Sequence, residues 1–385
     1  MGKEKKPPKY KHMRVEEKKK MHIALKITLI VLAVIVLFIG SILLYINAKL
    51  DLIVYDNEVD DSVYSSVSTD TENTESSTEP DKEEEEIDVT EETEEAIVDI
   101  AGLEVVEDLP DAEELLNENT EETIYSDNSV MNILLIGTDE RSNSFSTNAR
   151  SDSMILVSIN KAKNTVKLVS LERGMGVPIL EGDYAGQYDW LTHIFRYGGA
   201  NLLVKTVRTC FNLDLDKYVR VNFNSVRQVV DMIGGIDMYL SEAEANALDI
   251  DGTGYEEYTA GAGVYHLDGE KALSYARLRS IDSDWQRVAR QRNVIMAVVQ
   301  RMKNSNLFEL DSLANAVLPL VQTNLSKWEI AELVMYVPSF VNSDFDQMTV
   351  PPDGTYGGMT GMGGRGMFAP DFELNSQILH EFLYE

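Results

Sequence analysis

The pattern of hydrophobic and polar positions divides the 385-residue chain into three parts. An unbroken apolar run, Ile27–Ile46, is followed by a long polar stretch over residues 51–128. From residue 129 onward, short apolar runs alternate with amphipathic stretches of helical period. We therefore expect a tail over 1–22, a transmembrane helix over 23–48, a linker over 49–128 and one folded domain over 129–385.

The apolar run is long enough to cross a membrane. Its twenty residues carry no charged side chain, and as a helix they span the ~30 Å of the hydrocarbon core. Nine lysines and arginines lie between Lys3 and Lys20, and a basic segment before a span stays in the cytoplasm. A cleaved signal peptide is the alternative, but its apolar region is usually ~7–15 residues, and the sequence around Ala48 is a poor cleavage site. We expect a single-pass protein of the cell membrane with a cytoplasmic N-terminus and an extracytoplasmic domain.

The formal net charge of −31 belongs mainly to the polar stretch. Residues 1–50 carry 11 basic and 3 acidic side chains (+8), residues 51–128 carry 1 and 30 (−29), and residues 129–385 carry 22 and 32 (−10). Repulsion between like charges and the scarcity of apolar residues predict an extended, disordered linker. The folded domain is net acidic, faces outward and lacks basic, aromatic-rich strands, which argues against nucleic-acid binding.

Within residues 129–385 the pattern predicts an α/β fold with a mixed central sheet sandwiched between helices. Short apolar runs predict strands at Val130–Gly137, Met154–Ile159, Thr165–Leu171, Val219–Phe223, Ile236–Leu240 and Gln347–Val350. Helical periodicity predicts helices at Ala200–Phe211, Ser225–Ile233, Gly269–Leu278, Asp284–Lys303, Phe308–Val321, Lys327–Phe340 and Ser376–Leu383. The glycine-rich stretch Gly354–Gly366 is either a mobile loop near a site or a mere connection. The single cysteine, Cys210, excludes an internal disulfide and is expected to be buried.

Acidic residues stand at the ends of two predicted strands. Asp139 follows the strand that ends in Gly137, and Asp152 lies just before the next strand, after Arg150. Ligands of α/β sheets tend to bind at such strand ends. Two carboxylates brought there by one short loop can share a hard divalent cation such as Mg²⁺. The spacing by itself slightly favours the alternative that both aspartates only cap turns.

Five arginines gather around the start of one predicted helix: Arg277, Arg279, Arg287, Arg290 and Arg292. Ser283 and Gln286 have the spacing of a capping box, which predicts that the helix begins at Asp284. Its apolar stripe, extended upstream, places Asp284 and Gln291 on the core-facing side with Arg287 beside them. Arginines beside the partly positive end of a helix suit a phosphate or pyrophosphate. The alternative is an exposed basic helix face, which fits Arg290 and Arg292 better than Arg287.

Two further positions are candidate site residues. Arg173 lies at another strand end, where an arginine is usually solvated or ion-paired. His193 is expected to be a core or hydrogen-bonding histidine, because no second ligand stands nearby at metal-binding spacing. The sequence contains no Gly-x-Ser-x-Gly elbow, P-loop or Rossmann glycine pattern, so serine hydrolases, NTPases and dehydrogenases lose support.

These clusters, in this order and spacing, closely resemble the LytR-CpsA-Psr family of bacterial cell-envelope phosphotransferases. The resemblance covers about Asn132 to Lys303 and rests on seven segments: NILLIGTDER, RSDSMIL, SLERG, LTHIFRYGGA, VNFNSVRQVVDMIGGIDM, HLDGEKALSYARLRS and DWQRVARQR. A short cytoplasmic tail, one membrane span and an extracytoplasmic catalytic domain also match the topology of this family.

The resemblance implies an enzyme that moves a glycopolymer phosphate from a polyprenyl-pyrophosphate carrier to a muramic-acid hydroxyl of peptidoglycan. Such enzymes attach wall teichoic acids, capsules or other polymers, here in the wall of a Gram-positive-type bacterium. By the family pattern, Asp139 and Asp152 would hold Mg²⁺ or Mn²⁺ and would act in catalysis together with Arg173 and Arg287. The residues that would bind the pyrophosphate are Arg150, Arg173, Arg277, Arg279, Arg287 and Gln291. Phosphoryl transfer depends mainly on positioning and on neutralising charge, which arginines and a metal supply.

Some positions depart from the family pattern. Glu172 and Gly174 stand where the family usually has a proline and an acidic residue around Arg173, and Trp190 stands where a lysine is common. Without the acidic residue, the Arg173 guanidinium is expected to be freed or to lose its fixed orientation. These departures keep two other functions open. One is hydrolysis of a polyprenyl-pyrophosphate glycan, and the other is a non-catalytic module that binds wall polymers.

Overall fold

The structure is a computed structural model that describes residues 44–56, 98–107, 109–110, 112–118, 124–140, 145, 149–250, 260–303, 307–340 and 345–385. The chain divides into two units, one ending at Leu52 and one running from Ile53 to the C-terminus. Of the first unit, the structure describes a helical segment over residues 44–50. Among the described residues, no helix has the length and apolarity needed to cross a bilayer. The expected tail and nearly all of the expected transmembrane helix lie outside the described residues.

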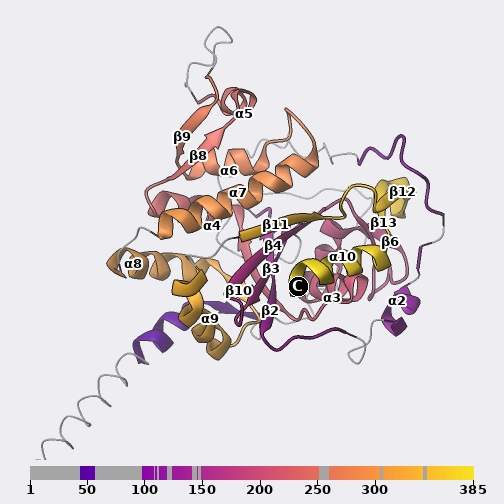
Figure 1. The fold of residues 1–385 in the computed structure, drawn as a ribbon, viewed down its shortest axis with the longest axis horizontal. Helices are drawn as coiled ribbons and strands as arrows, with labels where there is room; N and C mark the ends of the chain where they lie inside the picture. Colours follow the sequence, from indigo (N-terminus) through magenta and orange to yellow (C-terminus); the bar gives the residue numbers. More distant parts are fainter. Residues whose placement is uncertain are drawn as a thin grey trace, which may run out of the picture. The chain divides into compact units, whose positions relative to one another are not determined.

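The second unit is built on a seven-stranded mixed sheet (Figure 1). Its spatial order is β1 (Val54–Tyr55), β10 (Gln322–Thr323), β7 (Lys217–Asn222), β2 (Val130–Thr138), β3 (Ser151–Asn160), β4 (Thr165–Leu171) and β11 (Phe345–Val350). β3 runs antiparallel to β2 and β4, whereas β7 is parallel to β2 and β11 is parallel to β4. The expected mixed sheet is confirmed, and β3 and β4, which correspond to two consecutive predicted strands, form an antiparallel hairpin.

Helices cover both faces of this sheet (Figure 1). On one face, Leu134 and Ile136 of β2 share a hydrophobic core with α3 (Leu191–Phe211) and α10 (Phe372–Tyr384). On the other face, Ile133 belongs to a core with α7 (Asp284–Met302) and α9 (Lys327–Phe340). Successive side chains of a strand point to opposite faces, so one apolar run supplies both cores. The predicted arrangement of a sheet between helices is confirmed.

A third hydrophobic cluster lies outside the sheet. It is formed by α4 (Phe223–Met232), β8 (Ile236–Leu240), α5 (Glu242–Ala247), β9 (Gly263–Leu267), α6 (Gly269–Arg277) and α8 (Leu307–Val317). α7 contributes Val294 to this cluster and Ile295 to the core under the sheet. Because α7 is packed from two sides, the residues at its beginning are held firmly in relation to the sheet.

Three predicted details differ from the structure. α3 begins at Leu191 rather than at Ala200, and only Gly198 and Gly199 leave helical backbone angles within it. The glycine-rich stretch is neither a loop nor a simple connection, since β12 (Tyr356–Thr360) and β13 (Gly366–Pro370) form an antiparallel hairpin there. α7 begins at Asp284 as expected, but the side chain of Ser283 makes no capping hydrogen bond.

The expected disordered linker over residues 49–128 is wrong for several stretches that the structure describes. β1 extends the sheet beside β10, and α2 (Ala112–Glu118) packs Leu115 into the core that contains α3. The backbone N–H of Val106 donates to the carbonyl of Gly358 at 2.9 Å, which joins this segment to β12. Short apolar segments stabilise this packing, because each removes hydrophobic side chains such as Leu115 from water. Residues 57–97 of the expected linker lie outside the described residues.

Candidate functional site

Three candidate residues meet at one edge of the sheet. β2 and β4 run in the same direction and β3 runs against them, so the end of β2, the start of β3 and the end of β4 lie together. Asp139 follows β2, Asp152 is the second residue of β3, and Arg173 follows β4. The pairing of β2 with β3 is irregular between Gly137 and Thr138, just before Asp139. Sequence-distant charged groups are thus brought to a single location.

Asp139 is paired with Arg150 across the base of the loop between β2 and β3. Its Oδ1 accepts a hydrogen bond from the backbone N–H of Arg150 at 2.9 Å, and its Oδ2 accepts from Arg150 Nε at 3.0 Å. The two side chains are 25% and 34% exposed, so solvent weakens the attraction between their charges. The main consequence is geometric, since the carboxylate is fixed at the strand end.

Asp284 joins three arginines of the predicted cluster. Its Oδ2 accepts hydrogen bonds from Arg287 Nη2 at 2.9 Å and from Arg173 Nε at 3.2 Å. Its Oδ1 lies 3.7 Å from Arg279 Nε. Arg173 and Arg287 are both buried, and the Nε of Arg287 has no hydrogen-bond partner among the described residues. Three guanidinium groups outnumber the carboxylates that they contact, even when Asp152 beside Arg173 is counted with Asp284, and this excess of positive charge suits a pyrophosphate.

Arg173 connects this cluster to Asp152. Its Nη1 donates to Asp152 Oδ1 at 3.4 Å, and Gln291 Nε2 donates to the backbone carbonyl of Asp152, also at 3.4 Å. The expectation that Arg173 would be freed or loosened by the departure at Gly174 is therefore wrong. Two other carboxylates, Asp152 and Asp284, hold its guanidinium.

The proximity of these charges changes their acid–base behaviour. Burial, and then the neighbouring Asp284, raise the pKa of Glu172 to about 8. Burial acts to raise the pKa of Asp284 as well, but Arg287 and the other hydrogen-bonded and charged neighbours lower it to about 2. Burial, followed by the positive charges of Arg287 and Arg173, lowers the pKa of Arg279 to about 10. At neutral pH the Asp284 carboxyl is thus ionised and the Glu172 carboxyl is protonated.

A cavity of about 480 Å³ opens beside the cluster. The charged residues in its wall are Asp99, Glu172, Arg173, Arg279, Asp282 and Asp284. Another part of the wall is aromatic: Trp285 stacks on Tyr356 with 5.6 Å between ring centroids, and Phe368 also lies 5.6 Å from Trp285. β12 and β13 therefore supply part of this wall, and the segment from Val98 to Leu103 supplies another part.

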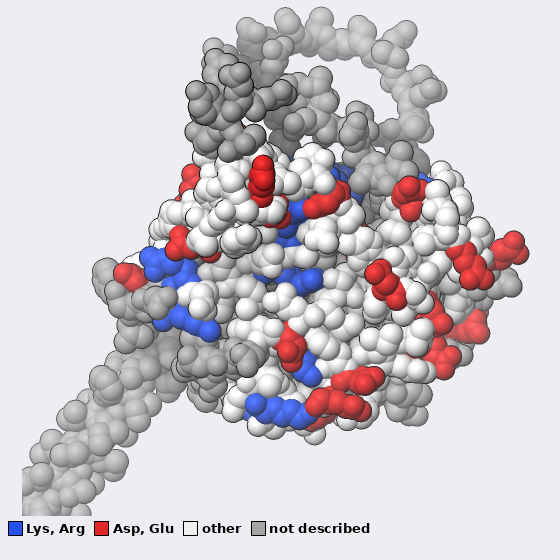
Figure 2. Space-filling view, turned by 45° about the horizontal axis from the view of Figure 1, so that its top comes forward, with Lys and Arg blue, Asp and Glu red and all other residues white. Residues whose placement is uncertain are grey.

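Both signs of charge occur on the surface of the described residues. Figure 2 shows basic side chains at the centre and left of one face, with acidic side chains among them and along its right side. The net negative charge of the domain is thus unevenly spread, and it does not exclude an anionic ligand.

Other arginines of the predicted cluster lie apart from this site. The exposed Arg277 places its guanidinium 5.1 Å from the ring centre of Phe223, and no contact that the structure describes joins it to Asp284. The alternative of an exposed basic face is wrong for Arg290 and Arg292, which are 3% and 9% exposed. Arg290 bonds Asp282, Glu244 and the carbonyl of Leu278, whereas Arg292 bonds Ser170, Thr349 and Gln347. Both arginines anchor α7 to its surroundings.

His193 is a buried hydrogen-bonding residue, as predicted. Its Nδ1 lies 3.1 Å from Asp189 Oδ1, and its ring stacks on Trp190 with 5.1 Å between centroids. Tyr197 donates to the other oxygen of Asp189 at 2.7 Å. Burial acts to raise the pKa of Asp189, but these hydrogen bonds and the charge of His193 bring it below its ordinary value. Cys210 is also buried, as predicted.

The residues present fit a divalent cation only as a partial ligand set. Among the described residues, no three His, Cys, Asp or Glu side chains come close enough together to hold a metal. Asp139 and Asp152 nevertheless lie at adjacent strand ends and are partly accessible, with 25% and 12% of each side chain exposed. Mg²⁺ commonly takes one or two carboxylates and completes its shell with waters and substrate phosphates. Two aspartates beside an arginine cluster fit that pattern.

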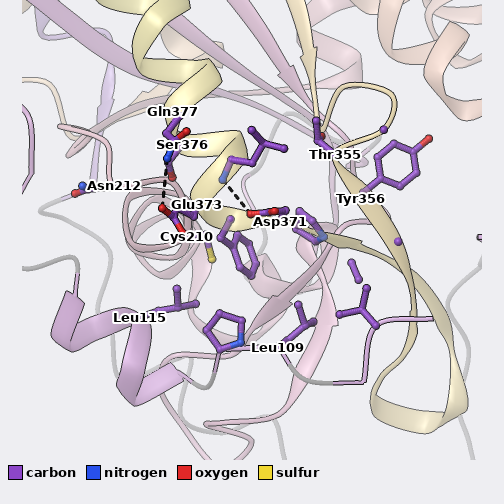
Figure 3. Close-up of a pocket in the computed structure, with 18 of the residues that line it drawn as sticks. Leu109, Leu115, Cys210, Asn212, Thr355, Tyr356, Asp371, Glu373, Ser376 and Gln377 are labelled. Carbon is purple, nitrogen blue, oxygen red and sulfur yellow. Dashed lines mark hydrogen bonds between the residues drawn. The ribbon is translucent and has the colours of Figure 1, made fainter. Parts of the chain in front are cut away.

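A larger cavity, of about 840 Å³, lies beside α10 and β12 (Figure 3). Its polar groups already serve the fold: Asp371 accepts from the backbone N–H of Leu374, and Gln377 donates to Glu373 at 3.3 Å. Its acidic residues include Glu104, Asp371 and Glu373, and none of the residues that line it is an arginine. The arginine-lined cavity is therefore the better site for an anionic substrate.

Sequence reasoning missed part of the site. The sequence marks Glu172 only as a departure from the family pattern. It marks Asp284 only as the first residue of a helix, although the helical pattern places Asp284 on the core-facing side. Tyr356 and Phe368 lie far along the chain in a stretch without a chemical motif. The available signal was the polar Asp284 on an apolar stripe, because a buried carboxylate requires a positively charged partner.

Comparisons with known proteins identify the family of this chain. The model of the LytR-CpsA-Psr family matches residues 63–371. The polyisoprenyl-teichoic acid–peptidoglycan teichoic acid transferase TagU of Bacillus cereus is 30% identical over 241 residues, which are 62% of this chain and 74% of the relative. The transferase TagT of Bacillus subtilis is 31% identical over 256 residues, which are 65% of this chain and 73% of the relative.

Solved structures show the same fold. The structure described as TagT bound to LIIa-WTA superposes with a TM-score of 0.53 and 26% identity, over 66% of this chain and 90% of the other. A protein of Streptococcus agalactiae gives a TM-score of 0.55 with 25% identity, over 66% and 88% of the two chains. Because the family match extends over most of the chain and includes all the charged residues of the site, this chain belongs to the LytR-CpsA-Psr family.

Proposed function

We propose that this protein transfers a glycopolymer phosphate from a polyprenyl-pyrophosphate carrier to a muramic-acid hydroxyl of peptidoglycan. The observation that carries the proposal is the gathering of Arg173, Arg279 and Arg287 around Asp284, beside two aspartates at one sheet edge. The relatives named as teichoic acid transferases act on polyisoprenyl-linked teichoic acid and peptidoglycan, which supports the same substrate class here.

The arginines have a direct role in this reaction. Arg173, Arg279 and Arg287 would bind the non-bridging pyrophosphate oxygens and stabilise the charge that develops on them as the hydroxyl oxygen attacks phosphorus. The bond between that phosphorus and the bridging oxygen breaks, and the polyprenyl phosphate leaves with the electron pair. The proton of the acceptor hydroxyl would pass to a carboxylate at this sheet edge, such as Asp152. Gln291 holds the backbone of Asp152 and so maintains the strand end at which the acceptor would enter.

Asp139 and Asp152 would hold a Mg²⁺ or Mn²⁺ ion. When bound, the ion would neutralise pyrophosphate charge and orient the phosphate for attack. The support is the partial accessibility of both carboxylates and the preference of Mg²⁺ for carboxylate and phosphate oxygens. Arg150 fixes Asp139 through two hydrogen bonds. The Asp139 carboxylate, as a proposed metal ligand, therefore does not need to be ordered when the ion binds.

We also propose that the protein is anchored in the cell membrane, with its N-terminus in the cytoplasm and the domain outside. The support is the uncharged run Ile27–Ile46 and the basic residues before it. A lipid-linked substrate requires a site near the membrane surface, and a single-pass anchor provides this position.

One assay tests the proposal against its alternatives. The full-length protein is incubated in detergent with Mg²⁺, a lipid-pyrophosphate-linked glycan and peptidoglycan oligomers, and the products are separated by mass. A covalent glycan–peptidoglycan conjugate supports transfer. Free sugar phosphate without a conjugate would indicate a hydrolase, and tight binding without either product would indicate a binding module. Either of these results contradicts the proposed function.

A further inference from the structure

Glu172 is a buried acid that the proposed reaction does not use. It is 1% exposed, and its Oε1 accepts only a long hydrogen bond, from the backbone N–H of Gly174 at 3.4 Å. Glu172 Oε2 and Asp284 Oδ1 are both buried, and no N–H or O–H group among the described residues donates to either of them. Both residues lie in the wall of the arginine-lined cavity.

The neighbouring Asp284 carboxyl, after burial, raises the pKa of Glu172, and a proton between their two donor-free oxygens would satisfy both of them. Two carboxylates can only accept, and side by side in a buried place they would repel each other strongly. Asp284 has two charge-assisted hydrogen bonds from arginines, whereas Glu172 has none among the described residues. The proton therefore resides on Glu172, which becomes the donor, and Asp284 remains the ionised acceptor.

We propose that neutral Glu172 is a positioning residue that fixes Asp284 by a hydrogen bond and thereby sets the charge of the pyrophosphate site. It acts through Asp284, whose carboxylate holds Arg173, Arg279 and Arg287 in place. With Glu172 neutral, the three guanidinium groups and the carboxylates of Asp284 and Asp152 give the cluster a formal net charge of +1. With Glu172 ionised, the donor is lost and the formal net charge falls to zero. This inference rests on the proposed binding of pyrophosphate by these arginines.

The charge of this pair depends on all the ionisable groups around it. Those that face Glu172 or line the same cavity are Asp284 and Arg287 on α7, Arg279 and Asp282 before α7, Arg173 after β4, Tyr356 on β12 with its partner Asp353, and Asp99. The pKa of Glu172 is about 8, whereas that of Asp284 is about 2 and that of Arg279 is about 10. Of these three groups, Glu172 is therefore the one whose charge changes most between pH 7 and 9.

The first test measures the binding of inorganic pyrophosphate to the full-length protein by titration calorimetry at pH 7 and pH 9. Glu172→Gln supplies a permanently neutral side chain that can still donate to Asp284. Because pyrophosphate itself ionises over this range, the informative quantity is the ratio of the wild-type Kd to the variant Kd. We expect this ratio to be near one at pH 7 and to rise about tenfold at pH 9, as the wild-type cluster loses one unit of charge.

Control variants separate positioning from folding. Glu172→Ala removes the donor and is expected to weaken binding already at pH 7, and the conservative glutamine is expected to restore it. Glu181→Gln removes an exposed carboxyl paired with Lys205 and is expected to leave the pH dependence unchanged. Thermal unfolding of each variant checks that the compared proteins are folded.

Two results would overturn the proposal. One is a Kd ratio that stays near one at pH 9, which would mean that Glu172 does not change the charge of the site. The other appears in the transfer assay: loss of kcat in Glu172→Gln at every pH with unchanged KM would identify Glu172 as a group that exchanges a proton with the substrate. Pyrophosphate binding does not require turnover, so failure of the transfer assay in the wild type would contradict the proposed function without deciding this inference.

Discussion

Arg287→Ala removes the most deeply buried arginine of the proposed pyrophosphate site. Arg287 is 2% exposed and donates to Asp284 at 2.9 Å, and its Nε has no hydrogen-bond partner among the described residues. A buried donor without a partner is costly in a folded protein, and a phosphate oxygen of the substrate would satisfy it. We therefore expect the substitution to impair transfer more than it impairs folding.

The structure sets the size of both effects. After the substitution, Asp284 keeps its hydrogen bond from Arg173 at 3.2 Å and its ion pair with Arg279 at 3.7 Å. The variant therefore loses one hydrogen bond between charged groups, which should lower the free energy of unfolding by ~1.5–3 kcal/mol. This is less than the ~3–5 kcal/mol expected when a buried charge is left unpaired. The loss of one donor to the developing charge should cost ~2.7–4 kcal/mol in the transition state, or ~10²–10³-fold in kcat.

The assay is single-turnover transfer of a lipid-pyrophosphate-linked glycan to peptidoglycan oligomers, well below the Tm of each variant. The matched control is Arg292→Ala, which removes a buried arginine of the same helix whose hydrogen bonds go to Ser170, Thr349 and Gln347. It is expected to lower the Tm while transfer stays within ~3-fold of wild type. If Arg287→Ala also stays within that range, Arg287 does not bind the reacting phosphate. If both variants lose transfer in proportion to their Tm, the effect is one of folding.

Three further outcomes are expected. Chelation of divalent cations should stop transfer, and added Mg²⁺ or Mn²⁺ should restore it. The Asp152→Asn variant should require a higher metal concentration to reach half of its maximal rate. Transfer at full rate in excess chelator would contradict the metal site. Gly137→Ala would place a Cβ 2.9 Å from the Cβ of Ser153 on the paired strand, so we expect a stability loss of ~1–3 kcal/mol by chemical denaturation together with slower transfer. Asp189→Asn should weaken the contact with His193 and remove a pH-dependent contribution to the free energy of unfolding. Because the pKa of Asp189 is lowered in the folded protein, its carboxylate stabilises the fold above pH ~4, and this stability is lost as the pH falls. Unfolding curves of the variant that match the wild type from pH 3 to 7 would refute this.

Local patterns predicted the main elements of the fold, because burial in a sheet or on one helix face leaves a period in the sequence. The start of α3 was missed because the Gly198–Gly199 pair interrupts the helical angles. The helical turn before this glycine pair nevertheless buries Leu191, Ile194 and Phe195, which are spaced as on one face of a helix. Composition was misleading before residue 129, where acidic neighbours hid short apolar segments such as the one around Leu115.

The site was predictable in its residue types but only partly in its contacts. Strand ends correctly brought Asp139, Asp152 and Arg173 together, because the direction of the strands follows from the hairpin. The contact between Asp284 and Arg173 joins positions 111 residues apart and depends on how α7 packs on the sheet. The partners of Arg290 lie on α5 and on the loop before α7, so the helix pattern alone could not distinguish it from an exposed residue.

The pairing of β1 with β10 changes the role of the acidic stretch. The sequence 57–97 carries 17 acidic side chains and one lysine, a net charge of −16. The described positions on either side of it both belong to the folded domain: Tyr55 pairs with Thr323 in the sheet, and Val98 lies in the wall of the arginine-lined cavity. The acidic sequence is therefore attached to the chain beside the proposed pyrophosphate site, where its charge would repel polyanions that are not delivered by a lipid.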